Sequence, residues 1–258
     1  MSELADALAV LSGAVVGFVL GLIGGGGSIL AVPLLLYGVG MESTHLAIGT
    51  SAVAVSANAL MGLVGHAHSG TVKWPCAATF AGAGILGAWL GSSLGKAVDG
   101  KALLSLFAVA MIAVGVNTLL ARKADGDADV AINPRIAAKL LGLGGATGIA
   151  AGFFGIGGGF LIVPGLMMGS GMAMLNAVGS SLVSVFALGA ATAANYAVSG
   201  LVDWHIATLF VAGGFFGSLA GIRAAKSLAE RRGLLTQVFG WIVVVAGLYV
   251  LAHSLLSG

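Results

Sequence analysis

Two glycine-rich stretches of nearly the same sequence lie about half a chain length apart. The first runs from Gly17 to Pro33, the second runs from Gly148 to Pro164, and 8 of the 17 aligned positions are identical. A run of glycines interrupts a helix, because each glycine loses about 1 kcal/mol of helix propensity relative to alanine. The helix that follows begins with unpaired N–H groups and a partial positive charge, which together favour an anion. We therefore expect a pair of anion-binding turns.

The candidate ligand groups at these turns are backbone N–H groups and hydroxyls, because no Lys or Arg occurs between residues 1 and 72 or between 140 and 222. The residues expected to bind substrate are Gly25, Gly26, Gly27, Ser28, Thr50 and Ser51 in the first half and Gly157, Gly158, Gly159, Ser180 and Ser181 in the second. Pro33 and Pro164 are expected to help break the helices, since proline lacks an N–H. Two other interpretations stay open: glycines also allow close helix packing, and hydroxyls also bond to carbonyls of their own helix.

The similarity between the halves extends beyond the glycines. Gly49-Thr50-Ser51 aligns with Gly179-Ser180-Ser181, and Trp74 aligns with Trp204, both at a shift of 130 residues. Broken helices at equivalent places in two membrane halves are typical of a transporter's substrate site.

The composition predicts an all-α membrane protein. The chain is 59% hydrophobic and 8% charged, with a mean hydropathy of +1.09, whereas a soluble domain carries roughly 25% charged residues. Apolar runs between polar breaks give five segments per half, near 4–23, 28–39, 43–65, 75–95, 102–121, 135–154, 160–169, 172–198, 205–222 and 234–256. The second segment of each half is too short to span a bilayer, so we expect it to be re-entrant or to continue a broken helix.

A polar stretch separates the halves. We expect residues 1–121 to form a first transmembrane repeat, residues 122–135 a polar cytoplasmic linker, and residues 136–258 a second transmembrane repeat. Inverted repeats would place Lys96 and Lys101 on one side and the nine other basic residues opposite, whereas parallel repeats would divide them six to five. Because basic residues gather in the cytoplasm, we favour inverted repeats with both termini outside, in a bacterial-type inner membrane.

Few ionisable residues lie near membrane depth, where they are usually functional. His66 and Glu42 are the candidates for proton coupling, although Glu42 also suits an ordinary role in the first turn of a helix. The position equivalent to His66 in the second half is Tyr196, so no symmetric proton relay is indicated.

Motifs for enzyme chemistry are missing from the sequence. It contains no metalloprotease His-Glu-x-x-His, no Gly-x-Ser-x-Gly and no Walker loop. Its one cysteine, Cys76, excludes a cysteine metal cluster, and the net charge of +2 does not suggest nucleic acid. We expect no catalytic residues, no metal and no cofactor.

The duplicated glycine motif, each copy followed by a proline, together with Gly49-Thr50-Ser51 and Trp74, resembles the TauE/SafE family of sulfite exporters, also called TSUP transporters. On this resemblance the family's glycine turns fall on Gly24 to Gly27 and on Gly155 and Gly157 to Gly159. Ser28 stands where the second copy has Gly159, so the two turns are chemically unequal.

The resemblance implies a multi-spanning secondary transporter, most often an exporter, of small sulfur-containing anions such as sulfite, thiosulfate or organosulfonates. The expected mechanism is alternating access around two glycine turns that meet near the membrane midplane, with H+ as a candidate coupling ion. A passive anion channel and a structural subunit of a membrane complex remain the alternatives.

Overall fold

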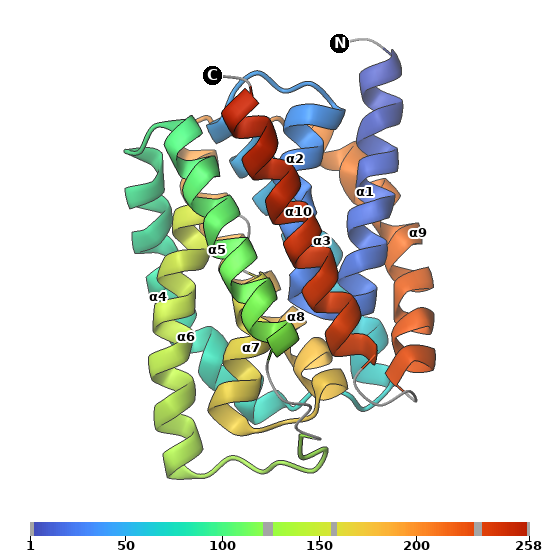
Figure 1. The fold of residues 1–258 in the computed structure, drawn as a ribbon, viewed down its shortest axis with the longest axis vertical. Helices are drawn as coiled ribbons and strands as arrows, with labels where there is room; N and C mark the ends of the chain where they lie inside the picture. The colour runs from blue at the N-terminus through green and yellow to red at the C-terminus, as the bar shows by residue number, and fades with distance from the viewer. Residues whose placement is uncertain (1–2, 121–125, 156–158, 230–233, 257–258) are drawn as a thin grey trace.

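In the computed structural model, which describes residues 3–120, 126–155, 159–229 and 234–256, the first half of the chain consists of helices joined by short loops (Figure 1). Its elements are α1 (Glu3–Ile23), a 3-10 helix η1 (Gly24–Leu30), α2 (Ala31–Pro33), a π-helical turn η2 (Leu34–Gly38), α3 (Thr44–His68), α4 (Trp74–Lys96) and α5 (Gly100–Leu120). The four long helices each coincide with an expected apolar segment to within a few residues, and η1, α2 and η2 together cover the segment expected at 28–39.

The second half repeats this order of elements. It consists of α6 (Pro134–Phe154), α7 (Gly159–Ser170), α8 (Met174–Val198), α9 (Trp204–Ala229) and α10 (Leu234–Leu256). The side chain of Asn133 caps α6 by accepting a hydrogen bond from the N–H of Ile136 at 2.9 Å, so the helix begins at Pro134, a position that favours proline.

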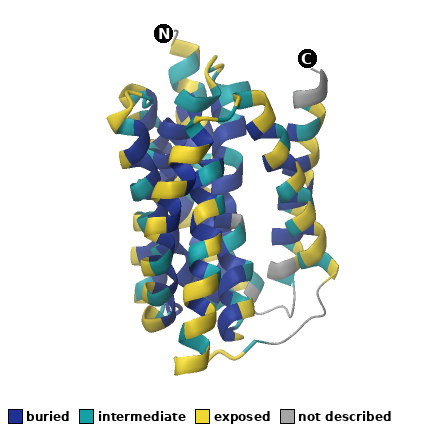
Figure 2. Ribbon diagram, turned by 90° about the vertical axis from the view of Figure 1, so that its left-hand side faces the viewer, coloured by how far each residue is buried: buried dark blue, intermediate teal, exposed yellow. Residues whose placement is uncertain are grey.

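The helices present an apolar exterior. Within the described residues, seven helical stretches are long and apolar enough to cross a membrane. Large apolar side chains on the outside include Leu86, Leu90 and Phe216, while the inward helix faces are buried (Figure 2). Such a surface is stable only against lipid or another apolar partner, and the chain is an all-α membrane protein as predicted.

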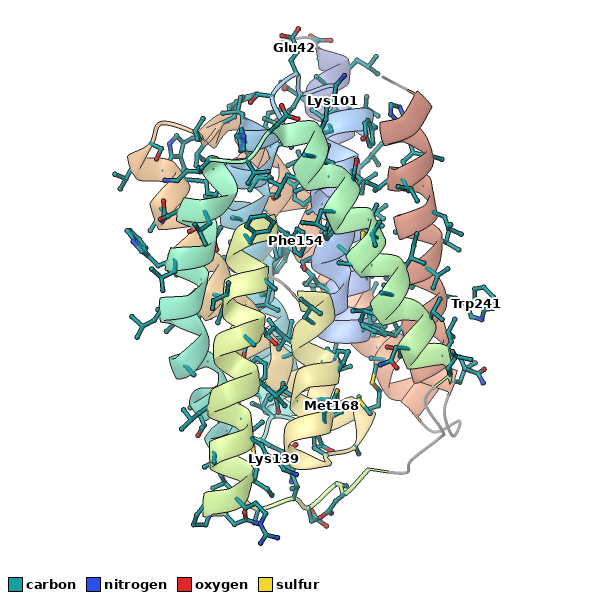
Figure 3. All side chains as sticks on the ribbon, turned by 60° about the vertical axis from the view of Figure 1, so that its left-hand side comes forward. Glu42, Lys101, Lys139, Phe154, Met168 and Trp241 are labelled. Carbon is teal, nitrogen blue, oxygen red and sulfur yellow. The ribbon has the colours of Figure 1, made fainter. Side chains whose placement is uncertain are left out.

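The short second segment of each half doubles back toward the end from which the preceding helix came. The stretch from Glu3 to Gly38 is helical throughout, but it reverses direction after α1, so that Glu42 lies at the end of the bundle where α1 begins (Figures 1 and 3). We call this the terminal end, because α10 also finishes there, and we call the opposite end, which carries residues 126–133, the linker end. The segment is thus re-entrant, which decides between the two expected alternatives.

Helices from different halves pair in a reciprocal pattern. The helix α1 packs along α9, α6 packs along α4, α3 packs on α8, and α5 packs on α10. Exchanging the halves reproduces this list. Corresponding helices also run in opposite directions: α1 runs from the terminal end toward the linker end, and α6 runs the other way (Figure 1).

Glycines allow the α1–α9 and α4–α6 pairs to approach closely. A Cβ atom placed on Gly17 would lie 2.2 Å from the carbonyl oxygen of Gly214, and one placed on Gly148 would lie 2.2 Å from that of Gly84. These four glycines match at the repeat shift. Helix backbones this close are typical of small-residue packing in membranes.

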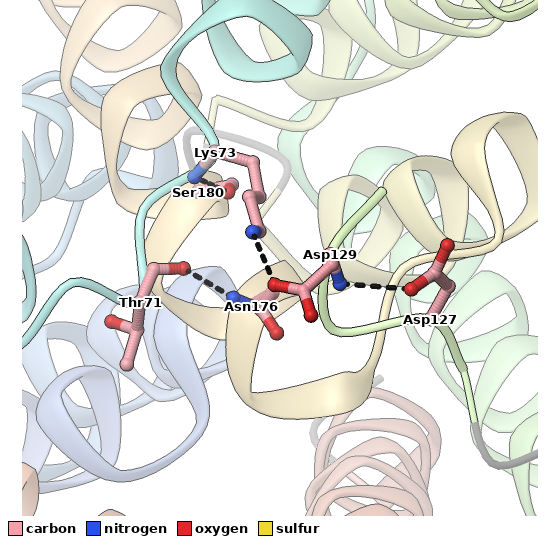
Figure 4. A network of polar contacts seen from close by, with 6 residues as sticks. All are labelled: Thr71, Lys73, Asp127, Asp129, Asn176 and Ser180. Carbon is pink, nitrogen blue, oxygen red and sulfur yellow. Dashed lines mark hydrogen bonds and ion pairs between the residues drawn. The ribbon is translucent and has the colours of Figure 1, made fainter. Parts of the chain in front are cut away.

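The linker is held against the bundle by backbone hydrogen bonds. The N–H of Asp127 donates to the carbonyl of Gly171 at 2.9 Å, and the N–H of Ala173 donates to the carbonyl of Asp127 at 3.0 Å. Lys73 Nζ lies 3.8 Å from Asp129 Oδ1 (Figure 4). This ion pair adds little stability, because Asp129 is fully exposed.

Candidate functional site

Each glycine turn begins with a left-handed glycine. Gly24 follows α1 with φ of +63°, and Gly155 follows α6 with φ of +69°, a conformation that other residues adopt at a steric cost. A Cβ atom on Gly24 would lie 2.6 Å from the carbonyl oxygen of Val178, and one on Gly155 would lie 1.8 Å from Cγ2 of Ile48. Ile48 and Val178 are themselves equivalent residues of α3 and α8, so each turn is pressed against the long helix of the other half.

The two turns touch each other. A Cβ atom on Gly25 would lie 2.6 Å from the carbonyl oxygen of Gly159, and one on Gly159 would lie 1.6 Å from the carbonyl oxygen of Gly25. Only glycine permits this contact of backbone with backbone. The structure therefore brings together Gly25 and Gly159, two residues expected from the sequence to bind substrate.

Side chains replace a helical hydrogen bond at the first turn. In a continuous helix the N–H of Gly25 would donate to the carbonyl of Gly21, but α1 ends at Ile23. The N–H of Gly25 instead donates to Ser181 Oγ of α8 at 2.9 Å, and Nε2 of His66 on α3 donates to the carbonyl of Gly21 at 3.1 Å. Ser181 belongs to the second half and His66 to the first, so side chains of both halves stabilise the break in the helix.

The remaining glycines of the first turn are also buried. A Cβ atom on Gly26 would lie 2.3 Å from the ring of Phe239 on α10, and one on Gly27 would lie 2.2 Å from the backbone nitrogen of Leu20. Ser28 donates its hydroxyl to the carbonyl of Gly25 at 2.8 Å, which stabilises the turn from within. Gly157 and Gly158 lie outside the described residues.

The hydroxyls of the second candidate group are bonded to backbone. The N–H of Asp203 donates to Thr50 Oγ1 at 2.9 Å. At the equivalent position, the N–H of Lys73 donates to Ser180 Oγ at 2.8 Å (Figure 4). Both hydroxyls therefore fasten the loop before a transmembrane helix.

The neighbouring serines bond differently. Ser51 donates to the carbonyl of Ile48 at 2.8 Å, and Ser181 donates to that of Val178 at 2.7 Å. Because Ser181 also accepts from Gly25, it is the hydroxyl of this group with a described bond to a glycine turn.

The prolines lie beyond the breaks. Pro33 falls within the short helix α2, and the chain continues as the π-helical turn η2. Pro164 lies inside α7. The change of chain direction occurs at the glycines in both halves.

Glu42 and His66 do not meet. Glu42 is exposed at the terminal end, next to Ser43, which caps α3 by accepting from the N–H of Leu46 at 3.3 Å (Figure 3). His66 is fully buried near the other end of α3. The two candidates for proton coupling therefore lie near opposite ends of α3, and the sequence had already offered Glu42 an ordinary role in the first turn of a helix.

Asn58 is a polar residue that lies outside the glycine turns. It is fully buried on α3, and its amide has no hydrogen-bond partner within the described ranges. A Cβ atom on Gly214 of α9 would lie 1.9 Å from its Nδ2. The equivalent residue of the second half, Leu188, is apolar and packs against Gly84. The buried amide of Asn58 therefore has no polar counterpart at the equivalent position.

Two cavities lined by described residues do not include the glycines of the turns. One, of about 590 Å³, is bounded by apolar side chains of the re-entrant segment and α10, including Leu34 and Ile242. The other, of about 380 Å³, lies between α3 and α8 near Ser56 and Phe186. The close contact at Gly25 indicates that the turns are closed on each other in this conformation.

Comparison with known proteins identifies the family of the chain. The family model described as sulfite exporter TauE/SafE matches residues 9–250. A "Probable membrane transporter protein" of Xylella fastidiosa is 50% identical over 244 residues, covering 94% of each chain. The "Probable membrane transporter protein YdhB" of Bacillus subtilis is 24% identical over 213 residues, covering 80% of this chain and 85% of its own. No solved structure matches. The chain belongs to the TauE/SafE sulfite exporter family, which is a family of membrane transporters and not of enzymes.

Proposed function

We propose that this protein is a secondary transporter that exports small sulfur-containing anions, such as sulfite, thiosulfate or organosulfonates, by alternating access around its two glycine turns. The contact between Gly25 and Gly159 carries the proposal. It joins the starts of the two re-entrant segments, where N–H groups and hydroxyls are the polar groups and no lysine or arginine is near in sequence. Dipoles and hydroxyls suit an anion that must bind and then leave.

The hydrogen bond between Gly25 and Ser181 suggests how the site opens. In the closed conformation the N–H of Gly25 donates its hydrogen bond to Ser181 Oγ. When the turns separate, an oxyanion takes the place of that oxygen and receives hydrogen bonds from both groups. Gly26, Gly27, Ser28 and the second turn complete the site in this proposal.

We further propose that the halves are inverted repeats that rock against each other. The reciprocal helix pairing and the opposite helix directions support this relation. Thr50 and Ser180 each bond to a loop of the other half, so in this proposal these two contacts join the repeats and act as pivots of the motion.

The distribution of charge supports an orientation. Lys101 lies at the terminal end and Lys139 at the linker end (Figure 3), and among the described basic residues Lys73, Arg135 and Arg223 also belong to the linker end. By the positive-inside rule, we place the linker in the cytoplasm and both termini outside, in a bacterial-type inner membrane.

Ligand-dependent stability of detergent-purified protein tests the proposal. Sulfite, thiosulfate, sulfoacetate, taurine, sulfate, chloride and phosphate would each be added during thermal unfolding. A ligand at about 100 times its Kd stabilises the folded state by about 2.7 kcal/mol, which raises Tm by about 5–10 °C for a chain of this size.

The glycine turn is tested by the same measurement on two variants. Gly26→Leu, whose Cβ atom would meet the ring of Phe239, should abolish the shift, whereas Gly142→Leu, whose Cβ atom would meet nothing within 4 Å, should retain it. A folded Gly26→Leu protein that still responds to sulfur anions would refute the assigned site.

A further inference from the structure

Two helical faces stand apart across the larger cavity, which we call the α10 cavity. Its walls are the re-entrant segment and α10, and each wall presents side chains spaced three or four residues apart, which lie on one face of a helix. They include Leu30, Leu34 and Tyr37 on the first wall and Trp241, Val245 and Tyr249 on the second. Packed helices normally leave no such space between their facing side chains, but here about 590 Å³ stays open.

The same two elements touch at both ends of the α10 cavity. At one end the ring of Phe239 lies against the first glycine turn, where a Cβ atom on Gly26 would be 2.3 Å from a ring carbon. At the terminal end the ring of Tyr37 stacks on His253, with centroids 3.9 Å apart, and meets the ring of Tyr249 edge-on at 6.0 Å. The walls therefore touch, separate and touch again, so the cavity is built into the fold.

The mouth of the α10 cavity opens on the outside of the bundle. Trp241, Val245 and Tyr249 are 59%, 60% and 53% exposed, and Trp241 points away from the bundle (Figure 3). Pro33 and Ala246, on the inner side, are buried. The mouth is thus continuous with the apolar exterior that requires lipid or another apolar partner, and an apolar cavity is not a place for ordered water.

The dimensions of the α10 cavity indicate which apolar partner fits. Its lining runs from Leu30 to Gly38 on one wall and from Trp241 to Tyr249 on the other, which is about 12 Å at 1.5 Å per residue. The hydrocarbon of one leaflet is about 15 Å thick, so the cavity lies within one leaflet, the one at the terminal end.

The mean cross-section excludes a helix. A volume of 590 Å³ spread over that length gives about 50 Å². A helix with its side chains is about 10–12 Å wide and requires roughly 80–110 Å², so the helix of a second copy is too thick to enter. A flexible hydrocarbon chain is thinner than a helix and fits.

We propose that the α10 cavity is a phospholipid site. An acyl chain from the leaflet at the terminal end lies between the re-entrant segment and α10, and the head group lies beside the aromatic cluster of Tyr37, Tyr249 and His253, because amphipathic rings gather at the level of the head groups. The bound chain fills the space behind Phe239 and keeps that ring against Gly26. The proposal goes beyond the transport of anions and does not depend on which anion is carried.

Native mass spectrometry counts the lipids that the protein retains. The protein would be extracted into detergent from vesicles of palmitoyl-oleoyl phosphatidylethanolamine and phosphatidylglycerol. Val245→Trp narrows the mouth and Ala246→Phe fills the inner side, so each should retain one lipid fewer than the original protein. Leu248→Phe is the matched control, because Leu248 is 53% exposed on the same helix and does not line the cavity, and it should retain as many lipids as the original protein.

Two outcomes of this measurement would overturn the proposal. Equal numbers of retained lipids in the original protein and all three variants would place the lipids elsewhere on the surface. A dimer that carries no lipid, and that Val245→Trp converts to a monomer, would make a second copy the occupant of this face.

Thermal unfolding tests the same site without mass spectrometry and shows whether each variant is folded. All four proteins should unfold cooperatively in lipid-free detergent. Phosphatidylglycerol at about 100 times its Kd should raise the Tm of the original protein and of Leu248→Phe by about 5–10 °C. It should raise the Tm of Ala246→Phe much less, because the phenyl ring already occupies the space of the acyl chain. An equal rise in folded Ala246→Phe would contradict the proposed site, whichever anions the protein transports.

Discussion

Substitution of Gly159 by alanine tests the contact between the glycine turns. The added methyl group would begin 1.6 Å from the carbonyl oxygen of Gly25, where ordinary contacts are 3.4–4 Å. The two backbones would have to separate by roughly 1.5–2 Å, and overpacking in a close-packed interior costs about 1–3 kcal/mol. For a chain of this size, that loss lowers Tm by about 2–12 °C.

Gly142→Ala is the matched control, because Gly142 lies inside α6 and an added Cβ meets nothing within 4 Å. Here alanine should stabilise the helix by up to about 1 kcal/mol. Thermal unfolding of both variants, followed by circular dichroism in the same detergent, should shift Tm in opposite directions. Equal Tm values for Gly159→Ala and Gly142→Ala would mean that the turns are not in contact in the stable conformation, and the reasoning about the site would fail.

Three further expectations follow from contacts outside the turns. Thr50→Val leaves the N–H of Asp203 without its acceptor, so unfolding should become easier by about 1–3 kcal/mol; the exposed Thr208→Val should change Tm little, and equal effects would contradict the fastening role. Lys96 donates to Ser199 and to the backbone carbonyl of Asn195 at the end of α8, so Lys96→Met should lower Tm more than Lys101→Met does. Cys76 is 1% exposed and should react with a maleimide only as the protein unfolds; rapid reaction in the native protein would contradict the packing of α4.

The sequence predicts the helical segments well, because polar breaks and glycines interrupt long apolar runs. The segment expected over residues 43–65 is α3, which spans Thr44–His68, and the break expected at the glycine run begins at Gly24. These features are local, since helix propensity and hydropathy act within a few residues.

The contacts between distant elements could not be predicted in the same way. Thr50 and Asp203 are 153 residues apart, and Gly25 and Ser181 are 156 apart. The repeat shift relates Thr50 to Ser180 but does not say which element each hydroxyl meets. Likewise, the sequence marks His66 as ionisable, and only the fold shows that it bonds to the broken end of α1.

Counterflow in proteoliposomes tests the central claim most directly. Vesicles loaded with unlabelled thiosulfate would be diluted into a trace of sulfur-35 thiosulfate, with the membrane potential clamped at zero. An alternating-access carrier should accumulate label transiently above its equilibrium level, saturate with thiosulfate, and lose both properties in Gly26→Leu but not in Gly142→Leu. Flux that never exceeds equilibrium and grows linearly with concentration would indicate a channel and contradict the account.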